Sequence, residues 1–253
     1  FIGLIGHTGS GKSTLIQHLN GLLLPTQGTV IVNEMRIEKN SKDLKPLRQQ
    51  VGLVFQYPEQ QLFEETVGKD IAYGPKNLGL SGEDIDFRVK EAAELVGLPF
   101  EEVKDRSPFE RSGGQRRRVA IAGVLAMHPT ILILDEPTAG LDPRGRDEVL
   151  NGIRVLHEKN GYTIILVSHS MEDIARLVDR IVVMNKGRVV LTGSPREIFT
   201  HAEELESMGL GVPQITRLMK ALRQKGMDVP VDIYTVEQAK EALIKVLGEK
   251  RHA

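Results

Sequence analysis

The stretch that decides the fold is LIGHTGSGKSTL, residues 4–15. Residues 6–13 match the pattern G-x-x-x-x-G-K-[ST] in full, and they lie between a predicted buried strand and a predicted helix, the context that this pattern requires. The glycines let backbone N–H groups converge on phosphate oxygens, and the helix N-terminus adds partial positive charge. The stretch therefore predicts a loop that holds the phosphates of a nucleoside triphosphate.

Each residue of this loop is a candidate for nucleotide binding. We expect Lys12 to contact the β- and γ-phosphates and the hydroxyl of Ser13 to bind Mg²⁺. The loop alone leaves kinases, GTPases, helicases and transport ATPases open. The predicted nucleotide-binding residues are Gly6, His7, Thr8, Gly9, Ser10, Gly11, Lys12, Ser13 and Thr14.

Composition sets limits on the function. The chain has 253 residues, of which 40% are hydrophobic and 26% charged, so it can bury a sizeable core in one domain with an appendage or in two domains. Its formal net charge of −1 gives no basic field that would indicate nucleic-acid binding. Because it has no cysteine, disulfides, thiol catalysis and thiolate zinc sites are excluded. No apolar run approaches the ~20 residues that span a bilayer.

Predicted strands alternate with predicted helices along most of the chain, which indicates a mainly parallel α/β sheet. Between about residues 64 and 127 the pattern is helical and poor in strands. Residues 180–194 form a predicted hairpin with its turn at 185–187. The other predicted strands are residues 1–6, 28–32, 51–55, 131–135 and 163–169, and the predicted helices are 13–23, 146–159 and 171–179.

The chain from about residue 200 onward has a different pattern. Residues 215–226 carry an apolar stripe and end at a glycine. Residues 235–248 begin with a capping box formed by Thr235 and Gln238 and end at Gly248. We expect these two helices to belong to a small helical appendage.

Two further stretches carry residues suited to phosphate chemistry. The predicted strand ILILD ends in Asp135 and is followed by Glu136, and two such carboxylates are costly to bury unless they meet a cation or hydrogen bonds. Asp135 can hold the hydration shell of Mg²⁺, and Glu136 can polarise an attacking water. The sequence SGGQ, residues 112–115, opens a predicted helix, so Ser112 and the glycine N–H groups can form an anion cradle. The alternative is an ordinary N-cap followed by two glycines, which cost helix stability.

Taken in order, these residues resemble the ATP-binding cassette (ABC) family. The resemblance implies a P-loop NTPase core of the RecA-like type, an ABC helical subdomain at about 64–127 and head-to-tail dimers. Each ATP would lie between the Walker A motif of one subunit and the signature motif of the other. The motifs are Walker A (6–13), the Q-loop glutamine Gln56, the signature (111–115), Walker B (131–136), the D-loop (139–142) and the switch histidine His169.

Carried over by position, the resemblance also assigns roles to single residues. It implies that Glu136 is the general base and that His169 contacts the γ-phosphate and the attacking water. It implies that Gln56 binds Mg²⁺ and reports the nucleotide state to the helical subdomain, and that Asp142 communicates across the dimer. The implied catalytic residues are Glu136, His169, Gln56 and Lys12, the implied Mg²⁺ ligands are Ser13, Gln56 and Asp135, and the implied nucleotide contacts beyond the loop are Ser112, Gly113, Gly114, Gln115 and Asp142.

Arginines around the signature motif carry separate expectations. Arg111 stands where the family usually has leucine, which leaves the seating of the signature helix open. We expect Arg116, Arg117 and Arg118 to form the solvated face of that helix, with some pairing across the dimer. Nucleic-acid binding by this run is not expected, because the overall charge is balanced and aromatic residues are sparse.

A finer resemblance, carried by residues 57–81, 117–129, 138–146 and 168–199, is to the ATPases of energy-coupling factor (ECF) transporters. It implies an ATP-hydrolysing subunit that is peripheral on the cytoplasmic face of the cell membrane and powers uptake of vitamins or transition-metal ions. The implied partners are a second ABC ATPase, identical or related, a transmembrane coupling protein of the EcfT type and a substrate-binding membrane protein (S component). Residues 1–199 would form the ATPase domain and residues 200–253 a dimerisation appendage. The sequence does not name the transported substrate.

Two other classes of ABC ATPase are weaker alternatives. DNA-repair and chromosome ATPases carry long coiled-coil insertions, and the interval from Lys12 to Ser112 has no heptad run. Translation-type proteins carry two cassettes, and this chain has one. In the ABC family a segment upstream of Walker A supplies β-strands and an aromatic residue that stacks on adenine. Since Gly6 is only the sixth residue here, we expect about 25–35 further N-terminal residues in the natural protein.

Overall fold

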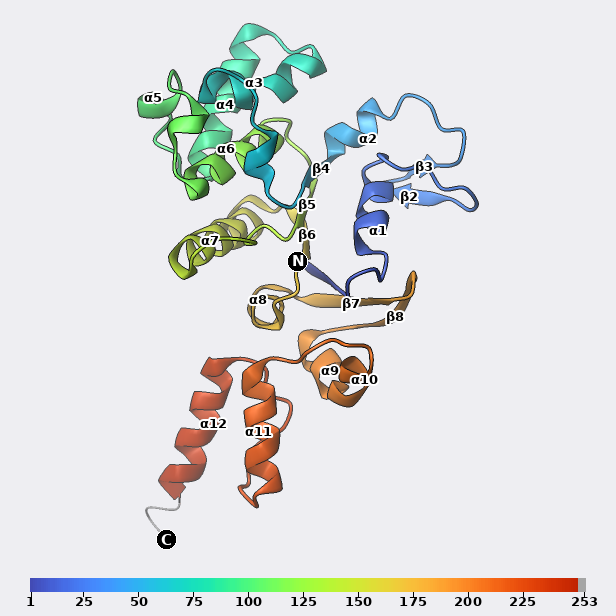
Figure 1. Ribbon diagram of the computed structural model, residues 1–253, viewed down its shortest axis with the longest axis vertical. Helices are drawn as coiled ribbons and strands as arrows, with labels where there is room; N and C mark the ends of the chain where they lie inside the picture. The colour runs from blue at the N-terminus through green and yellow to red at the C-terminus, as the bar shows by residue number, and fades with distance from the viewer. Residues whose placement is uncertain (250–253) are drawn as a thin grey trace. The chain divides into compact units, whose positions relative to one another are not determined.

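The computed structural model describes residues 1–249 and divides the chain into two compact units (Figure 1). The first unit is Phe1–Lys12 together with the chain from Leu166 onward, and the second is Ser13–Ile165. The chain leaves the first unit at the start of α1 (Lys12–Leu19) and returns to it within β6 (Thr163–Val167). Within residues 1–249, no helix has both the length and the apolar character that crossing a membrane requires.

Three strands organise the first unit. β1 (Ile2–Ile5) pairs in parallel with β7 (Arg180–Asn185), and β7 pairs antiparallel with β8 (Arg188–Gly193). The two-residue turn Lys186-Gly187 joins β7 to β8, and its φ angles of 49° and 75° are those of a positive-φ turn that suits the twist of a hairpin. The predicted hairpin and its turn are therefore confirmed.

Helices complete the first unit. α11 (Gln214–Gln224) and α12 (Val236–Glu249) lie side by side (Figure 1). The sequence pattern predicts these two helices but not the shorter α9 and α10 before them. The remaining helices are α8 (Met171–Leu177), α9 (Pro195–Thr200) and α10 (Ala202–Ser207), and the core between α11 and α12 is formed by Met219, Val229, Ile233 and Ala239.

The predicted capping box at the start of α12 is confirmed. The backbone N–H of Gln238 donates to the hydroxyl of Thr235, and the N–H of Thr235 donates to the side-chain oxygen of Gln238, both at 3.3 Å. α12 continues through Gly248 to Glu249, so the predicted end is one residue short. The rest of the predicted appendage, residues 250–253, lies outside the described residues.

The second unit is built on two parallel strands and a separate hairpin. β4 (Val51–Val54) pairs in parallel with β5 (Ile131–Asp135), in a register that aligns Val54 with Leu134. β2 (Val30–Val32) and β3 (Met35–Ile37) form an antiparallel pair. Parallel strands joined through helices occur in both units, which confirms the predicted α/β class.

Helices make up most of the rest of the second unit. α3 and α4 both pack against α6, and α7 contacts α6 as well. Residues 64–127 contain no strand. The elements are α3 (Val67–Leu78), α4 (Gly82–Leu95), α5 (Phe100–Val103), α6 (Gly113–Leu125) and α7 (Pro143–Asn160), with the 3₁₀ turns η1 (Pro58–Gln61) and η2 (Pro108–Glu110).

Two features near the start of the second unit differ from the sequence prediction. α1 ends at Leu19 rather than at residue 23, because the chain turns at Gly21, which has a φ of 70°. The pattern also misses α2 (Lys45–Gln50), whose six residues are too few to show a helical period.

Candidate functional site

The turn between β1 and α1 has a backbone that fits only glycine at several positions. Gly9 and Gly11 have φ angles of 82° and 100°. A side chain on Gly6 would place its Cβ 2.5 Å from the carbonyl oxygen of Met184. The glycines of the motif are therefore required by the geometry of the loop, and this agrees with a loop that brings its backbone close to a ligand.

The charged side chain of Lys12 contacts the same loop. Its side chain is buried, and Nζ donates to the carbonyl oxygens of Gly6 at 2.7 Å and His7 at 3.2 Å. A buried ammonium group beside a helix N-terminus and a glycine turn makes a positive site that fits the phosphates of a nucleotide.

The β7–β8 turn supports the loop from another part of the chain. The backbone N–H of Gly187 donates to the carbonyl oxygen of Ser10 at 2.9 Å. The imidazole of His7 lies between two oxygens, with Nε2 3.1 Å from Oδ1 of Asn185 and Nδ1 2.7 Å from the carbonyl oxygen of Thr8. The sequence gives no signal for these contacts, because Asn185 is 178 residues away from His7.

In the second unit, the parallel pairing of β4 and β5 brings polar residues to one edge. The strands run in the same direction with Val54 opposite Leu134, so the residues that follow them emerge together. These residues are Gln56 after β4, and Asp135 and Glu136 at the end of β5. Ligands bind at the carboxyl ends of strands in open α/β sheets, so the arrangement fits the predicted roles. The hydroxyl of Ser13, the amide of Gln56 and the carboxylate of Asp135 are also the oxygen ligands that Mg²⁺ prefers.

Both turns at this edge contain a residue with a left-handed backbone. Tyr57, directly after Gln56, has a φ of 56°, and Glu136 has a φ of 49°. Each precedes a proline, Pro58 or Pro137, and residues before proline prefer extended conformations. Such residues cost about 1–3 kcal/mol each and persist only where the surrounding structure holds them, most often at active sites.

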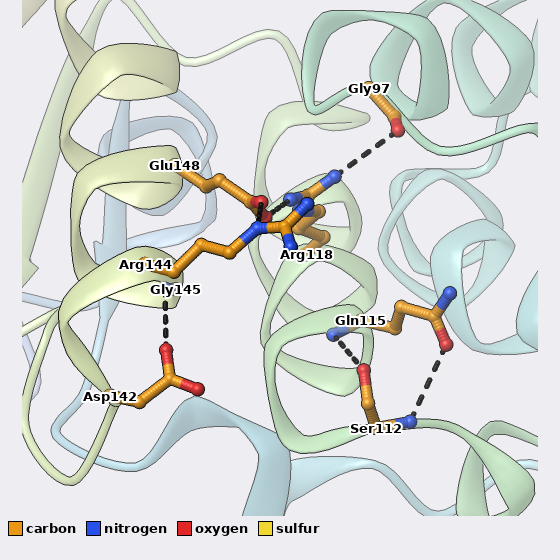
Figure 2. A network of polar contacts seen from close by, with 8 residues as sticks. All are labelled: Gly97, Ser112, Gln115, Arg118, Asp142, Arg144, Gly145 and Glu148. Carbon is orange, nitrogen blue, oxygen red and sulfur yellow. Dashed lines mark hydrogen bonds and ion pairs between the residues drawn. The ribbon is translucent and has the colours of Figure 1, made fainter.

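The signature motif starts a helix with an open first turn. The hydroxyl of Ser112 accepts from the backbone N–H of Gln115 at 3.3 Å, and the side chain of Gln115 accepts from the N–H of Ser112 at 3.4 Å (Figure 2). Apart from the adjoining residues and the backbone of α6 itself, no atom of residues 1–249 lies within 4 Å of where a Cβ of Gly113 or Gly114 would be. The predicted helix start is confirmed, and its glycines leave the end of α6 accessible to an anion.

Other predicted residues have structural contacts of their own. Asp142 is the N-cap of α7, and its Oδ1 accepts from the backbone N–H of Gly145 at 2.7 Å (Figure 2). His169 is exposed and directly precedes Ser170, the N-cap of α8, in the first unit. At Arg111, which replaces the usual leucine, Nε is buried and finds no hydrogen-bond partner among residues 1–249.

The expectation for the arginine run is wrong at Arg117. Its side chain is 1% exposed and not solvated. Its guanidinium donates to both carboxylate oxygens of Glu59, each at 2.9 Å, to the carbonyl oxygen of Pro137 at 2.8 Å and to that of Ala139 at 2.9 Å. We call this group the Arg117 clamp. Helical spacing offered a signal, because Arg117 shares one face of α6 with the buried residues Ile121 and Leu125.

Its neighbour Arg118 behaves more nearly as expected. Arg118 forms an ion pair with Glu148 of α7, which also binds Arg144, and it donates to the carbonyl oxygen of Gly97 (Figure 2). Both partners in the Arg118–Glu148 pair are partly exposed. Of these two adjacent arginines of α6, Arg117 thus makes buried contacts and Arg118 makes a surface contact.

A family model decides the classification. Residues 1–139 match the model described as "ABC transporter". The chain belongs to the ABC transporter family. This assignment confirms the predicted P-loop NTPase fold and the prediction of an ATP-binding ATPase, and it agrees with the order of the six motifs.

Relatives and solved structures refine the assignment. The chain is 60% identical over 247 residues to the energy-coupling factor transporter ATP-binding protein EcfA2 of Clostridium perfringens, covering 98% of this chain and 87% of that protein. It is 61% identical over 247 residues to the EcfA2 of Caldanaerobacter subterraneus, with 98% and 86% covered.

Two solved structures have similar folds. The chain matches cbiO1 from Clostridium perfringens, described as part of the ABC transporter complex cbiONQ, with a TM-score of 0.72 and 40% identity over 87% of this chain and 86% of that one. It matches the ATP-binding cassette MJ0796, in a dimeric post-hydrolysis state bound to ADP and Pi, with a TM-score of 0.66 and 30% identity over 77% and 85%.

Proposed function

We propose that the chain is the ATP-binding and ATP-hydrolysing subunit of an ECF-type ABC importer, which powers uptake of vitamins or transition-metal ions through membrane partners. The observation that carries the proposal is the similarity over 98% of the chain to EcfA2 proteins. The ATPase motifs in the sequence agree with it.

Within this function the chain's own residues have distinct tasks. Lys12 neutralises phosphate charge, and Ser13, Gln56 and Asp135 hold Mg²⁺. Bound Mg²⁺ supplies positive charge to the phosphates as they react. The carboxylate of Glu136 accepts a proton from the attacking water, which is general-base catalysis.

The remaining predicted residues act around the reacting atoms. His169 contacts the γ-phosphate and the attacking water. Ser112, Gly113, Gly114 and Gln115 present the N-terminus of α6 to the nucleotide of a paired ATPase, and Asp142 lies next to that interface. These tasks follow from the head-to-tail pairing that the family resemblance implies.

A cavity in the second unit supports docking of the membrane coupling protein. It has a volume of about 560 Å³ and lies among α2, α3, α6 and the segment at residues 61–63. Phe63 and Tyr73 meet there edge to face, with ring centroids 4.8 Å apart, although each is about half exposed. Exposed aromatic residues at a cavity are typical of a surface that receives another protein. We place the chain at the cytoplasmic face of the membrane through this contact.

The two C-terminal helices support pairing with a second ATPase, identical or related. Large apolar side chains on them are exposed, with 48% of Leu218, 62% of Ile244 and 52% of Leu247 accessible. Several large exposed apolar side chains on one pair of helices support the proposal that these helices contact another protein. We therefore keep residues 1–199 as the ATPase domain and 200–253 as the pairing appendage, with the S component contacting the coupling protein.

Affinity purification of the full chain from native detergent extract tests this function. We expect a second ABC ATPase, a multi-spanning coupling protein and an S component to co-purify. Tyr73→Asp should lose the membrane proteins and keep the second ATPase. Phe87→Asp is the matched control, because Phe87 is an exposed aromatic residue on α4 outside the cavity. Co-purification without any membrane protein, or an unchanged set with Tyr73→Asp, would contradict the proposal.

A further inference from the structure

The buried Arg117 clamp joins three segments of the second unit that carry different motifs. Arg117 comes from α6, which the signature motif opens, and Glu59 comes from η1, three residues after Gln56. The carbonyls of Pro137 and Ala139 belong to the turn that follows Glu136. Four hydrogen bonds of 2.8–2.9 Å therefore fix the Q-loop segment and the Walker B turn to one guanidinium group.

Both segments held by the clamp begin with a strained residue. Tyr57 and Glu136 have left-handed backbones and precede prolines, and the clamp binds each segment one to three residues further on. The two segments also lie close to each other, because a Cβ on Gly140 would lie 3.3 Å from Cε1 of Tyr57. The clamp is thus a polar link between two unfavourable turns.

The chemistry of the clamp favours a geometric role over a stabilising one. A buried ion pair is weak evidence for stability, because desolvation offsets much of the attraction and an apolar replacement is often no worse. The planar fork of arginine instead fixes several acceptors at defined angles, which lysine cannot do. Burial acts to raise the pKa of Glu59, but the hydrogen bonds and charge of Arg117 outweigh it and hold that pKa below the ordinary value.

We propose that Arg117 is a positioning residue for ATP hydrolysis, which sets the orientation of Glu136 by binding the turn after it and ties that orientation to the Q-loop segment through Glu59. The proposal rests on the proposed role of Glu136 as general base. Arg117 itself is not assigned a contact with nucleotide. Its loss should therefore change the rate of the chemical step more than the binding of ATP.

Steady-state kinetics of three variants of the full chain test this. Arg117→Met should lower kcat by about 10- to 100-fold, as expected for a displaced catalytic group, while KM for ATP changes by less than about threefold. Arg117→Lys should lose nearly as much, because it keeps the charge and lacks the fork. Glu148→Gln is the matched control: it breaks the partly exposed ion pair of Arg118 on the same helix and should leave kcat within about twofold.

A double-mutant cycle separates positioning from a general structural effect. In a Glu136→Gln background, single-turnover hydrolysis should fall little further when Arg117→Met is added, because the base that Arg117 positions is already absent. Losses that multiply in the double variant would overturn the proposal. A normal kcat in folded Arg117→Met, or full recovery with Arg117→Lys, would also overturn it.

Two checks distinguish misfolding of a variant, or failure of the proposed role of Glu136, from failure of the clamp proposal alone. If Arg117→Met does not fold by circular dichroism, Glu59→Gln replaces it in the same cycle, since Glu59 lies at the more exposed end of the clamp. If Glu136→Gln alone leaves turnover unchanged, the proposed role of Glu136 fails, and the clamp proposal, which acts through Glu136, fails with it. If Glu136→Gln is inactive but the cycle is multiplicative, the clamp proposal alone fails.

Discussion

The phosphate loop and the Arg117 clamp both hold polar groups in fixed positions, but they use different parts of the chain. The loop is a continuous stretch of eight residues, and its contacts with the β7–β8 turn include a backbone hydrogen bond from Gly187 to Ser10. The clamp joins residues that are 58 and 20–22 positions apart, and a single side chain makes all four of its hydrogen bonds.

The difference has a consequence for mutation. A loop held by backbone atoms is sensitive at its glycines and at the one side chain that supplies charge, Lys12. In the clamp one guanidinium makes every hydrogen bond, so substitution of Arg117 should have the largest effect. The carbonyls of Pro137 and Ala139 belong to the backbone and cannot be removed by substitution. We therefore expect the loop to control mainly nucleotide affinity and the clamp to control mainly turnover.

The largest effect should come from the loop. Lys12→Ala removes a buried ammonium group that donates to two loop carbonyls and that is proposed to meet the phosphates. ATP affinity measured by calorimetry should fall by about 100-fold or more, and turnover should be lost, because charge-assisted hydrogen bonds are about twice as strong as neutral ones. The exposed Lys42→Ala is the control. Wild-type affinity in Lys12→Ala would contradict this expectation, since the loop would then not be the phosphate site.

The next effect should fall on turnover alone. Glu136→Gln keeps the shape of the side chain and removes the base, so hydrolysis should slow by about 10²-fold or more. ATP binding should persist, since the phosphate loop is unchanged. Parallel measurement of ATP affinity and phosphate release checks both expectations. Hydrolysis at the normal rate would exclude Glu136 as the base.

A smaller effect should follow from the support behind the loop. Asn185→Ala removes the oxygen that faces Nε2 of His7 at 3.1 Å. One hydrogen bond contributes about 0.5–1.5 kcal/mol, so ATP affinity should fall by roughly 2- to 10-fold with kcat little changed. Asn40→Ala, at an exposed asparagine, is the control. If kcat falls instead of affinity, the loop and the clamp do not divide binding and turnover as proposed.

The smallest effect concerns the stability of the clamp at different pH values. The pKa of Glu59 is lowered from 4.5, so its contribution to stability is present above pH 4.5 and is lost as the pH falls through the lowered pKa. The free energy of unfolding of the wild type should therefore exceed that of Glu59→Gln by a constant amount near neutral pH. Denaturant unfolding at several pH values should show this gap closing below pH 4.5. A gap that is independent of pH would mean that the charge of Glu59 does not matter.

The same contrast explains how much of the molecule could be predicted. The phosphate loop, β5, the hairpin turn and the capping box of α12 are local patterns, and each is set by neighbouring residues. Parallel pairing of β4 with β5 could be expected, and it accounts for Gln56 and Glu136 sharing one edge. The assignments of catalytic and Mg²⁺-binding roles remain predictions.

The features that sequence reasoning missed are those that depend on distant partners or on very short elements. α2, α9 and α10 have six residues each and no room for a helical period. A run of three arginines is typical of a solvated helix face, but Arg117 lies on the same buried face of α6 as Ile121. The sequence near residue 117 does not indicate that Arg117 pairs with Glu59 or with the carbonyl oxygen of Pro137.

The left-handed backbone of Glu136 also matters for engineering this protein. Glycine or asparagine adopts such a conformation at lower cost than glutamate does. Selection for heat resistance alone would thus reward loss of the carboxylate on which turnover is proposed to depend, a conflict between stability and activity that is common at active sites. A screen for more robust variants of this chain should therefore measure phosphate release alongside melting temperature.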